Sequence, residues 1–125
     1  MTSDSSIKTL LITDDSRVSR MMIRSFVQAL QPNWVIVEAE SGPAALENIA
    51  HDAPHFCTMD INMPGMPGTE AVQLIREKYP NIKIAIFSTN IQESMQLRAA
   101  ELGAKFVSKP VTEKTVAQAI AYFLG

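Results

Sequence analysis

Near its start the sequence reads Ile7-Lys8-Thr9-Leu10-Leu11-Ile12-Thr13-Asp14-Asp15, a β-rich apolar run that ends directly in two carboxylates. A second run, residues 55–59, ends in the same way at Asp60. Short apolar runs of this kind are typical of strands that are buried on both faces of a parallel sheet. We therefore expect the ends of these two strands to bring three carboxylates together at one edge of a sheet.

Strand-like and helix-like segments alternate along the rest of the chain. Further β-rich runs cover residues 34–37, 82–87 and 105–107, and helix-compatible segments cover residues 44–50, 95–102 and 116–123. Apolar residues recur at helical spacing in two more segments, which contain Val18, Met21, Met22, Phe26 and Leu30, and Ala71, Leu74 and Ile75. This order predicts a (βα)₅ chain, with a parallel sheet covered by helices on both faces and joined by right-handed crossovers.

Local signals mark the ends of the expected helices. Residues 32–33, Pro-Asn, follow the first helix, and residues 41–43, Ser-Gly-Pro, begin the second. Gly103 stands where a helix C-terminus favours a residue that tolerates positive φ. Because no linker or repeat interrupts the pattern, we expect a polar N-terminal tail at residues 1–6 and one domain at residues 7–125.

Composition narrows the class of protein. With 125 residues, 46% apolar and 19% charged, the chain is typical of one globular domain. No run approaches the roughly 18 apolar residues that cross a bilayer, and the first six residues lack the features of a signal peptide, so we expect neither membrane insertion nor secretion. The single Cys57 lies in an apolar run, which fits a reduced, cytoplasmic protein. Charges of both signs are interspersed and sum to −2, so direct nucleic-acid binding is not expected.

The three carboxylates predict a cation site. Two unit charges about 4 Å apart repel by roughly 4 kcal/mol at an effective dielectric constant of 20. Ligands that are all oxygen favour Mg²⁺, with Mn²⁺ as an alternative. The competing interpretation is that Asp14 or Asp15 only caps the helix that begins near Ser16.

Two further polar residues are expected at the same edge of the sheet. Ser88 follows the strand at residues 82–87, and Lys109-Pro110 follows the strand at residues 105–107 after one serine. A carboxylate nucleophile, a metal site, a hydroxyl and an ammonium together indicate phosphoryl transfer. Taken singly, Lys109 would be read as a solvated surface lysine and Ser88 as a helix N-cap.

With these residues in this order, the chain resembles the receiver domain of bacterial two-component response regulators over about residues 8–124. The matching positions are Asp14-Asp15, Asp60 with the Ile-Asn-Met-Pro-Gly-Met-Pro-Gly segment at residues 61–68, Ser88, Phe106 and Lys109-Pro110. The resemblance implies a CheY-like, flavodoxin-like fold: a doubly wound, five-stranded parallel sheet with strand order 2-1-3-4-5.

The resemblance also implies roles for the acidic residues. Asp60 would accept a phosphoryl group from the phosphohistidine of a sensor histidine kinase or a histidine phosphotransfer protein. Asp15, Asp60 and the backbone carbonyl of Asn62 would bind Mg²⁺ directly, and Asp14 would act through a metal-bound water. Such a protein is a signalling receiver and not an enzyme acting on other substrates.

A second group of residues would form the switch. By resemblance, Lys109 and Ser88 contact phosphoryl oxygens, the Lys109–Pro110 peptide bond is cis, and Phe106 turns inward when Ser88 moves. A downstream protein would read the change on a surface formed by the fourth helix, fifth strand and fifth helix, roughly residues 92–123.

Three positions are expected to tune the chemistry. Thr89 stands where the family usually has alanine or another very small residue, so its bulk predicts slower access to the phosphoryl group. Asn62 and Asn90, two residues after Asp60 and Ser88 respectively, occupy positions that set the lifetime of the phosphorylated state in the family.

Other functions fit the residues less well. A phosphatase with an aspartate nucleophile after its first strand requires a second aspartate two residues later, but Arg17 lies two residues after Asp15. A flavodoxin-like FMN carrier requires a phosphate-binding loop where this chain has two carboxylates. We expect a stand-alone receiver, because the sequence starts at Met1 and stops just after the fifth helix, with a receiver excised from a larger regulator as the alternative.

Overall fold

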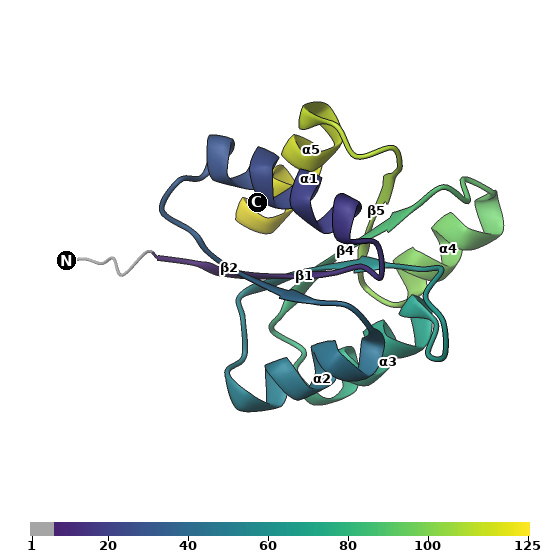
Figure 1. Cartoon of the computed structure of the whole chain (residues 1–125). Coiled ribbons are helices and arrows are strands. Elements are labelled where there is room, and N and C mark those ends of the chain that lie inside the picture. The colour runs from purple at the N-terminus through teal and green to yellow at the C-terminus, as the bar shows by residue number, and fades with distance from the viewer. Residues whose placement is uncertain (1–6) are drawn as a thin grey trace.

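The computed structural model describes residues 7–125, so the expected tail at residues 1–6 lies outside the described residues. Five strands alternate with five helices (Figure 1). In chain order they are β1 (Thr9–Thr13), α1 (Arg17–Leu30), β2 (Val35–Ala39), α2 (Gly42–His51), β3 (Phe56–Asp60), α3 (Gly68–Lys78), β4 (Lys83–Ser88), α4 (Glu93–Glu101), β5 (Lys105–Ser108) and α5 (Glu113–Leu124).

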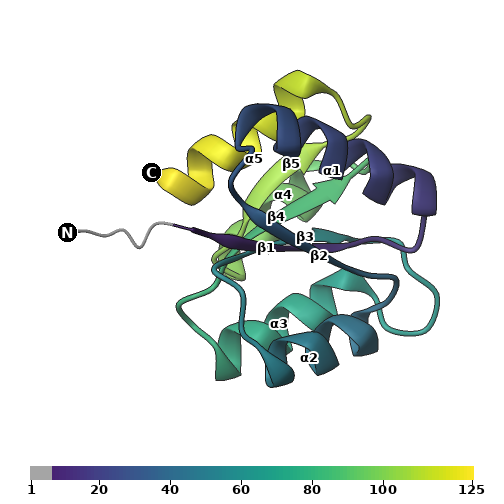
Figure 2. The same ribbon diagram turned by 60° about the vertical axis from the view of Figure 1, so that its left-hand side comes forward.

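The strands form one parallel sheet in the order β2-β1-β3-β4-β5, as predicted. Figures 1 and 2 show α1 and α5 over one face and α2 and α3 over the other. Helix α4 belongs to the second layer, because Ala99 is buried in the same hydrophobic cluster as residues of α2 and α3. The chain is therefore a doubly wound α/β fold.

Successive side chains along each strand point to opposite faces of the sheet, so a hydrophobic core forms on each face. On β1, Leu11 packs toward α2 and α3, whereas Leu10 and Ile12 pack toward α1 and α5. The central strands are buried on both faces, but β2 and β5 are the sheet edges. Val35 on β2 is 50% exposed, so the expectation that all five strands are buried on both faces is wrong for the edges.

Helix α1 forms where its periodicity predicts, but most of the apolar residues that predicted it face solvent. Val18 and Met21 are 64% and 56% exposed, and the fully buried residues are Ile23 and Val27. The helix begins with Ser16, whose Oγ accepts a hydrogen bond from the Ser19 N–H at 3.2 Å. The interpretation that Asp14 or Asp15 caps this helix is therefore wrong.

The other predicted boundaries are confirmed. Ser41 caps α2 by accepting a hydrogen bond from the Ala44 N–H, and Gly103 follows α4 with φ of +71°.

Within residues 7–125, no helix combines the length and apolar character that crossing a membrane requires.

Candidate functional site

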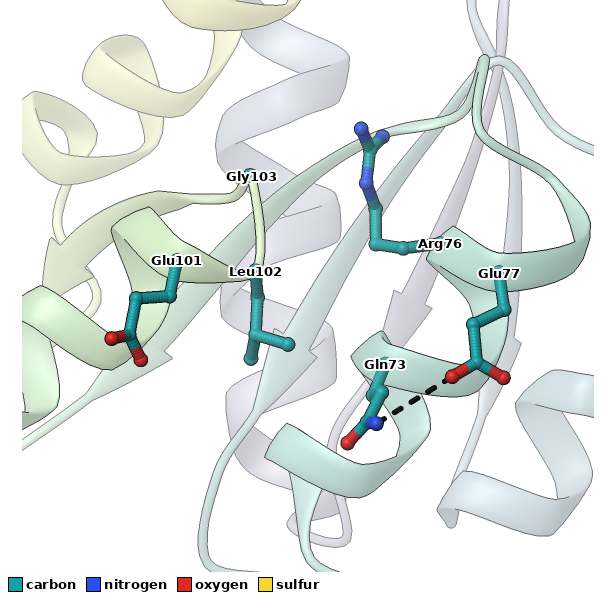
Figure 3. Close-up of a pocket in the computed structure, with 6 residues that line it drawn as sticks. All are labelled: Gln73, Arg76, Glu77, Glu101, Leu102 and Gly103. Atoms are coloured by element: carbon teal, nitrogen blue, oxygen red, sulfur yellow. Dashed lines mark hydrogen bonds between the residues drawn. The ribbon is translucent and has the colours of Figure 1, made fainter.

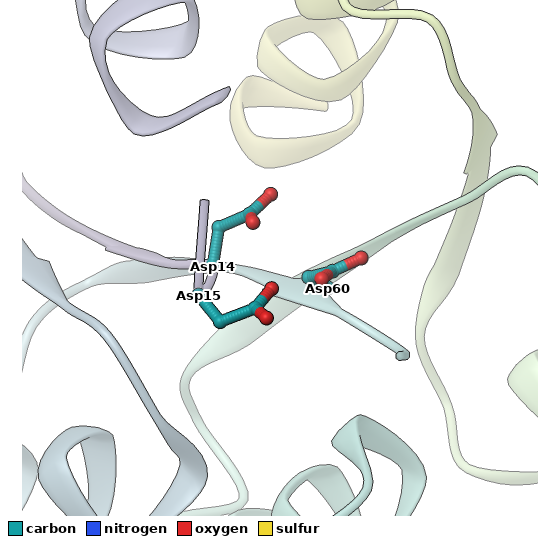
Figure 4. Close-up of side chains that lie close together, drawn as sticks. All are labelled: Asp14, Asp15 and Asp60. Carbon is teal, nitrogen blue, oxygen red and sulfur yellow. The ribbon is translucent and has the colours of Figure 1, made fainter. Parts of the chain in front are cut away.

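The carboxyl ends of β1 and β3 bring Asp14, Asp15 and Asp60 together, as the sequence predicts (Figure 4). One carboxylate oxygen from each residue lies within 4.8 Å of the other two. Asp14 and Asp60 are buried, and Asp15 is exposed. The cluster is thus rooted in the sheet and open to solvent on the side of Asp15.

Lys109 lies between two of these carboxylates. Its Nζ is 3.0 Å from Asp14 Oδ2 and 3.2 Å from Asp60 Oδ1, and its side chain is only 16% exposed. The Lys109 N–H donates to the Ser88 carbonyl at 2.9 Å, and the Lys109–Pro110 peptide bond is cis, as the resemblance implies. The interpretation of Lys109 as a solvated surface lysine is therefore wrong.

Burial and charge shift the pKa values of this group. Burial raises the pKa of Asp60, the negative charge of Asp14 raises it further, and Lys109 offsets only part of the effect. Burial opposes protonation of Lys109, but its hydrogen bond to Asp14 and the charges of Asp14 and Asp60 raise its pKa above the ordinary value. The Lys109 shift reflects the neighbouring carboxylates, whereas burial is the largest cause of the Asp60 shift.

The donor set fits a hard divalent cation. Three carboxylates face one ammonium, so the fully ionised group carries two uncompensated negative charges. Every candidate ligand is an oxygen, the donor type that Mg²⁺ prefers over softer metals. These residues therefore form a group that could hold a metal ion.

Ser88 ends β4 at the same edge and is buried. Its Oγ accepts a hydrogen bond from the Asn90 N–H at 3.0 Å, and Asn90 Oδ1 accepts one from the Gln92 N–H. The N-cap of α4 is Gln92, so the interpretation of Ser88 as a helix cap is wrong. Thr89, the next residue, is exposed.

The loop from β3 to α3 contains the exposed Asn62 and leads into Gly68, the first residue of α3. The Gly68 N–H donates to the Ile61 carbonyl at 3.0 Å. A Cβ on Gly68 would lie 2.0 Å from the backbone oxygen of Asp60, so only glycine lets α3 start this close to the strand end. The available signal was that Gly68 ends the matched segment at residues 61–68, shortly before the helical spacing of Ala71, Leu74 and Ile75.

Phe106 lies on the edge strand β5, which β4 separates from β3 and Asp60. It is partly buried and packs against the cluster that contains Ala99 of α4. The structure therefore places it next to the helix that the resemblance assigns to the readout surface.

Sequence reasoning also missed Arg20 on α1. Its Nη1 donates to the backbone carbonyl of Asp14 at 2.6 Å, and its Nε donates to Glu38 Oε1 at 2.9 Å. Arg24 Nε donates to Glu38 Oε2 at 2.6 Å. Burial raises the pKa of Glu38, but the two guanidinium groups outweigh this and lower it. The only signal in the sequence was two arginines four residues apart, which share a helix face.

A separate pocket of about 320 Å³ lies between the ends of α3 and α4 (Figure 3). Its lining residues are Gln73, Arg76, Glu77, Glu101, Leu102 and Gly103, and none belongs to the acidic cluster. Arg76 Nη1 donates to the carbonyls of Pro80 and Ile82, which ties the end of α3 to the start of β4. These hydrogen bonds give Arg76, which lines the pocket, a structural role.

Comparison with known proteins agrees with the geometry. The family model described as the response regulator receiver domain matches residues 10–121. The chain belongs to the response regulator receiver family. Among curated relatives of this receiver, the chemotaxis protein CheY of Thermotoga maritima is 36% identical, covering 90% of this chain and 94% of its own. CheY of Bacillus subtilis is 37% identical, covering 89% and 92%.

A solved structure also shares the fold of this receiver. The chemotaxis response regulator CheY4 of Vibrio cholerae superposes with a TM-score of 0.85 at 23% identity, covering 94% of this chain and 99% of the other. Receivers of this family are CheY-like signalling domains of two-component systems, in which phosphorylation on an aspartate is general. The match favours a receiver over the phosphatase and FMN-carrier alternatives.

Proposed function

We propose that this receiver is a phosphorylation switch in which Asp60 accepts a phosphoryl group. The donor is the phosphohistidine of a sensor histidine kinase or a histidine phosphotransfer protein. One observation carries the proposal: Asp60 ends β3 beside Asp14 and Asp15, with Lys109 Nζ 3.2 Å from its Oδ1. This arrangement combines a nucleophile with a cation that can balance the charge of the transferred group.

In the proposed reaction an Asp60 carboxylate oxygen attacks phosphorus, the P–N bond of the phosphohistidine breaks, and the imidazole leaves. Lys109 favours the ionised form of Asp60 before transfer and pairs with a phosphoryl oxygen afterwards. Ser88 Oγ already accepts a hydrogen bond from Asn90, so its O–H can donate to another phosphoryl oxygen.

The proposed ligands of Mg²⁺, or of Mn²⁺ in its place, are Asp15, Asp60 and the backbone carbonyl of Asn62, with Asp14 acting through a water. The oxygen-only donor set and the excess of negative charge support this assignment. When bound, the cation neutralises charge that develops on the phosphoryl oxygens.

The proposed output is phosphorylation-dependent binding of a downstream protein in the cytoplasm. Withdrawal of the Ser88 hydroxyl toward the phosphoryl group would leave room for Phe106 to turn inward and change the surface of α4, β5 and α5. The contact of Phe106 with the cluster beneath α4 supports this route. Asn62 and Asn90 are the proposed residues that tune the lifetime.

Incubation with acetyl phosphate and Mg²⁺, followed by intact-mass measurement, tests the acceptor. We expect one phosphoryl group to be added, and none after EDTA treatment or in Asp60→Asn. Asp52→Asn is the matched control, because it makes the same change at an exposed aspartate that ends α2. Modification that survives Asp60→Asn would place the acceptor elsewhere.

Thr89 is exposed next to the buried Ser88, which supports the proposal that its side chain restricts access to the phosphoryl group. We expect Thr89→Ala to accelerate both phosphorylation by acetyl phosphate and dephosphorylation. Unchanged rates in both directions would remove this role.

A further inference from the structure

Every polar group of Asp14 is engaged. Its N–H donates to the Ala39 carbonyl at 3.1 Å, and its own carbonyl accepts from Arg20 Nη1 at 2.6 Å. Its carboxylate accepts from the Ser16 N–H at 2.9 Å and from Lys109 Nζ at 3.0 Å. The peptide unit that joins Asp14 to Asp15 is therefore held at its carbonyl by a charged donor.

Asp15 is held less directly. It is exposed, yet one of its carboxylate oxygens lies within 4.8 Å of ligand oxygens from both Asp14 and Asp60. Since Asp15 follows immediately after Asp14, a rotation of the connecting peptide would move the Asp15 carboxylate. The hydrogen bond from Arg20 opposes that rotation.

Arg20 is itself held in place by Glu38 on the edge strand β2. Its side chain is 13% exposed, and its Nε is 2.9 Å from Glu38 Oε1 on β2. Glu38 also accepts from Arg24 at 2.6 Å, so two arginines of α1 hold one carboxylate in place. A chain of charge-assisted hydrogen bonds thus runs from β2 through Arg20 to the peptide between the two aspartates.

We propose that Arg20 is a positioning residue for the divalent cation site, acting through the Asp14 carbonyl to orient the Asp15 carboxylate, with Glu38 as its anchor. The inference deepens the proposed function, because it rests on a cation binding at the acidic cluster. The hydrogen bonds of Arg20 go to the Asp14 carbonyl and to Glu38 and not to the carboxylates of the acidic cluster, so its effect is on how well the ligands are arranged.

Arg24 provides a matched control within the same helix. It shares the Glu38 carboxylate with Arg20 and is four residues away, but its other bond, at 3.4 Å, goes to the Ile36 carbonyl and not to Asp14. Replacing either arginine by lysine keeps a positive charge and disturbs the same ion-pair network. Only the change at Arg20 removes the planar donor that bridges Glu38 and Asp14.

The first test is titration of the metal-free protein with Mg²⁺ by calorimetry. We expect Arg20→Lys to weaken Mg²⁺ binding about tenfold, the usual scale for groups that orient metal ligands. Arg24→Lys should change it less than about twofold by the same reasoning, with a similar loss of thermal stability. Equal Mg²⁺ affinities in the two variants would overturn the proposal.

A second measurement needs no metal. In the metal-free protein, amide hydrogen exchange at Asp14 and Ser16 should accelerate in Arg20→Lys and in Glu38→Gln, but not in Arg24→Lys. Unchanged exchange in Arg20→Lys would overturn the positioning role. If the parent protein bound no Mg²⁺, the proposed metal site would fail, and the exchange data would still decide whether Arg20 holds the turn.

Discussion

At Asp60 burial and charge act in the same direction. Both raise its pKa, and Lys109 offsets only part of the increase. The folded protein therefore keeps a proton on Asp60 at pH values where the unfolded chain, with an ordinary pKa of 3.8, has lost it. Since the folded state binds more protons there, this residue makes the metal-free protein less stable as pH rises through that window.

We predict that Asp60→Asn stabilises the metal-free protein near neutral pH. The amide removes a buried negative charge and its repulsion with Asp14. Urea denaturation between about pH 4 and pH 8 should show a smaller decline of the unfolding free energy in the variant than in the parent. Asp52→Asn is the control, and a variant less stable than the parent across this range would refute the prediction.

Thr58 on β3 carries a second group that is unfavourable for folding, a buried hydroxyl. The residue is 2% exposed, and its hydroxyl finds no hydrogen-bond partner within residues 7–125. We predict that Thr58→Val, which keeps the shape, raises the unfolding free energy by about 1 kcal/mol, because a desolvated hydroxyl is removed. Urea denaturation measures this.

Thr13→Val is the comparison for Thr58, since the Thr13 hydroxyl is equally buried but lies 3.9 Å from Cys57 Sγ. Thr13→Val should raise the unfolding free energy by less than Thr58→Val does. A loss of stability in Thr58→Val would show that its hydroxyl has a partner in solution, such as a bound water.

At the scale of elements, the start of α3 fixes the strand end that carries Asp60. We predict that Gly68→Ala lowers the unfolding free energy by more than about 2 kcal/mol, since its Cβ meets the Asp60 carbonyl, which cannot yield easily. The same variant should slow phosphorylation by acetyl phosphate, because relief of the clash displaces Asp60. Chemical denaturation and intact-mass kinetics measure the two effects.

Gly65 in the same loop is the matched control. It has φ of +81° with no atom within 4 Å of an added Cβ, so Gly65→Ala should cost only about 1 to 2 kcal/mol of conformational strain. Phosphorylation of Gly65→Ala should stay near the parent rate. If the two variants behaved alike, contact with the Asp60 backbone would not be the reason for Gly68.

Elements and the acidic cluster were predictable because both follow from local patterns. Apolar runs of strand length placed Asp15 and Asp60 at strand ends, and a parallel sheet brings such ends to one edge. Arg20 was not predictable in the same way, since its partners are a backbone carbonyl and Glu38, which is 18 positions away. The exposure of Val18 and Met21 shows the same limit, because periodicity predicts a helix without stating which face is covered.

Across the whole molecule, the sheet separates two cores, and the charged groups of the candidate site lie together at its carboxyl edge. The ends of β1, β3, β4 and β5 supply the acidic residues, Ser88 and, just beyond β5, Lys109. Residues that stabilise the fold and residues of the site are thus largely distinct sets. In the buried part of the site, the excess of negative charge is unfavourable for folding of the metal-free protein.

The stability of the whole molecule should therefore depend on Mg²⁺ with a recognisable sign. A ligand that binds only the folded state at a hundred times its dissociation constant adds about 2.7 kcal/mol to the unfolding free energy. We predict that Mg²⁺ raises the unfolding free energy of the parent and has much less effect on that of Asp60→Asn. The greater stability expected for Asp60→Asn in EDTA should therefore shrink or reverse in Mg²⁺. Asp15→Asn, at an exposed residue of the proposed cation site, should lose the response to Mg²⁺ without gaining comparable stability in EDTA. Urea denaturation at matched ionic strength measures all three proteins, and an equal Mg²⁺ response in the parent and both variants would place cation binding away from this cluster.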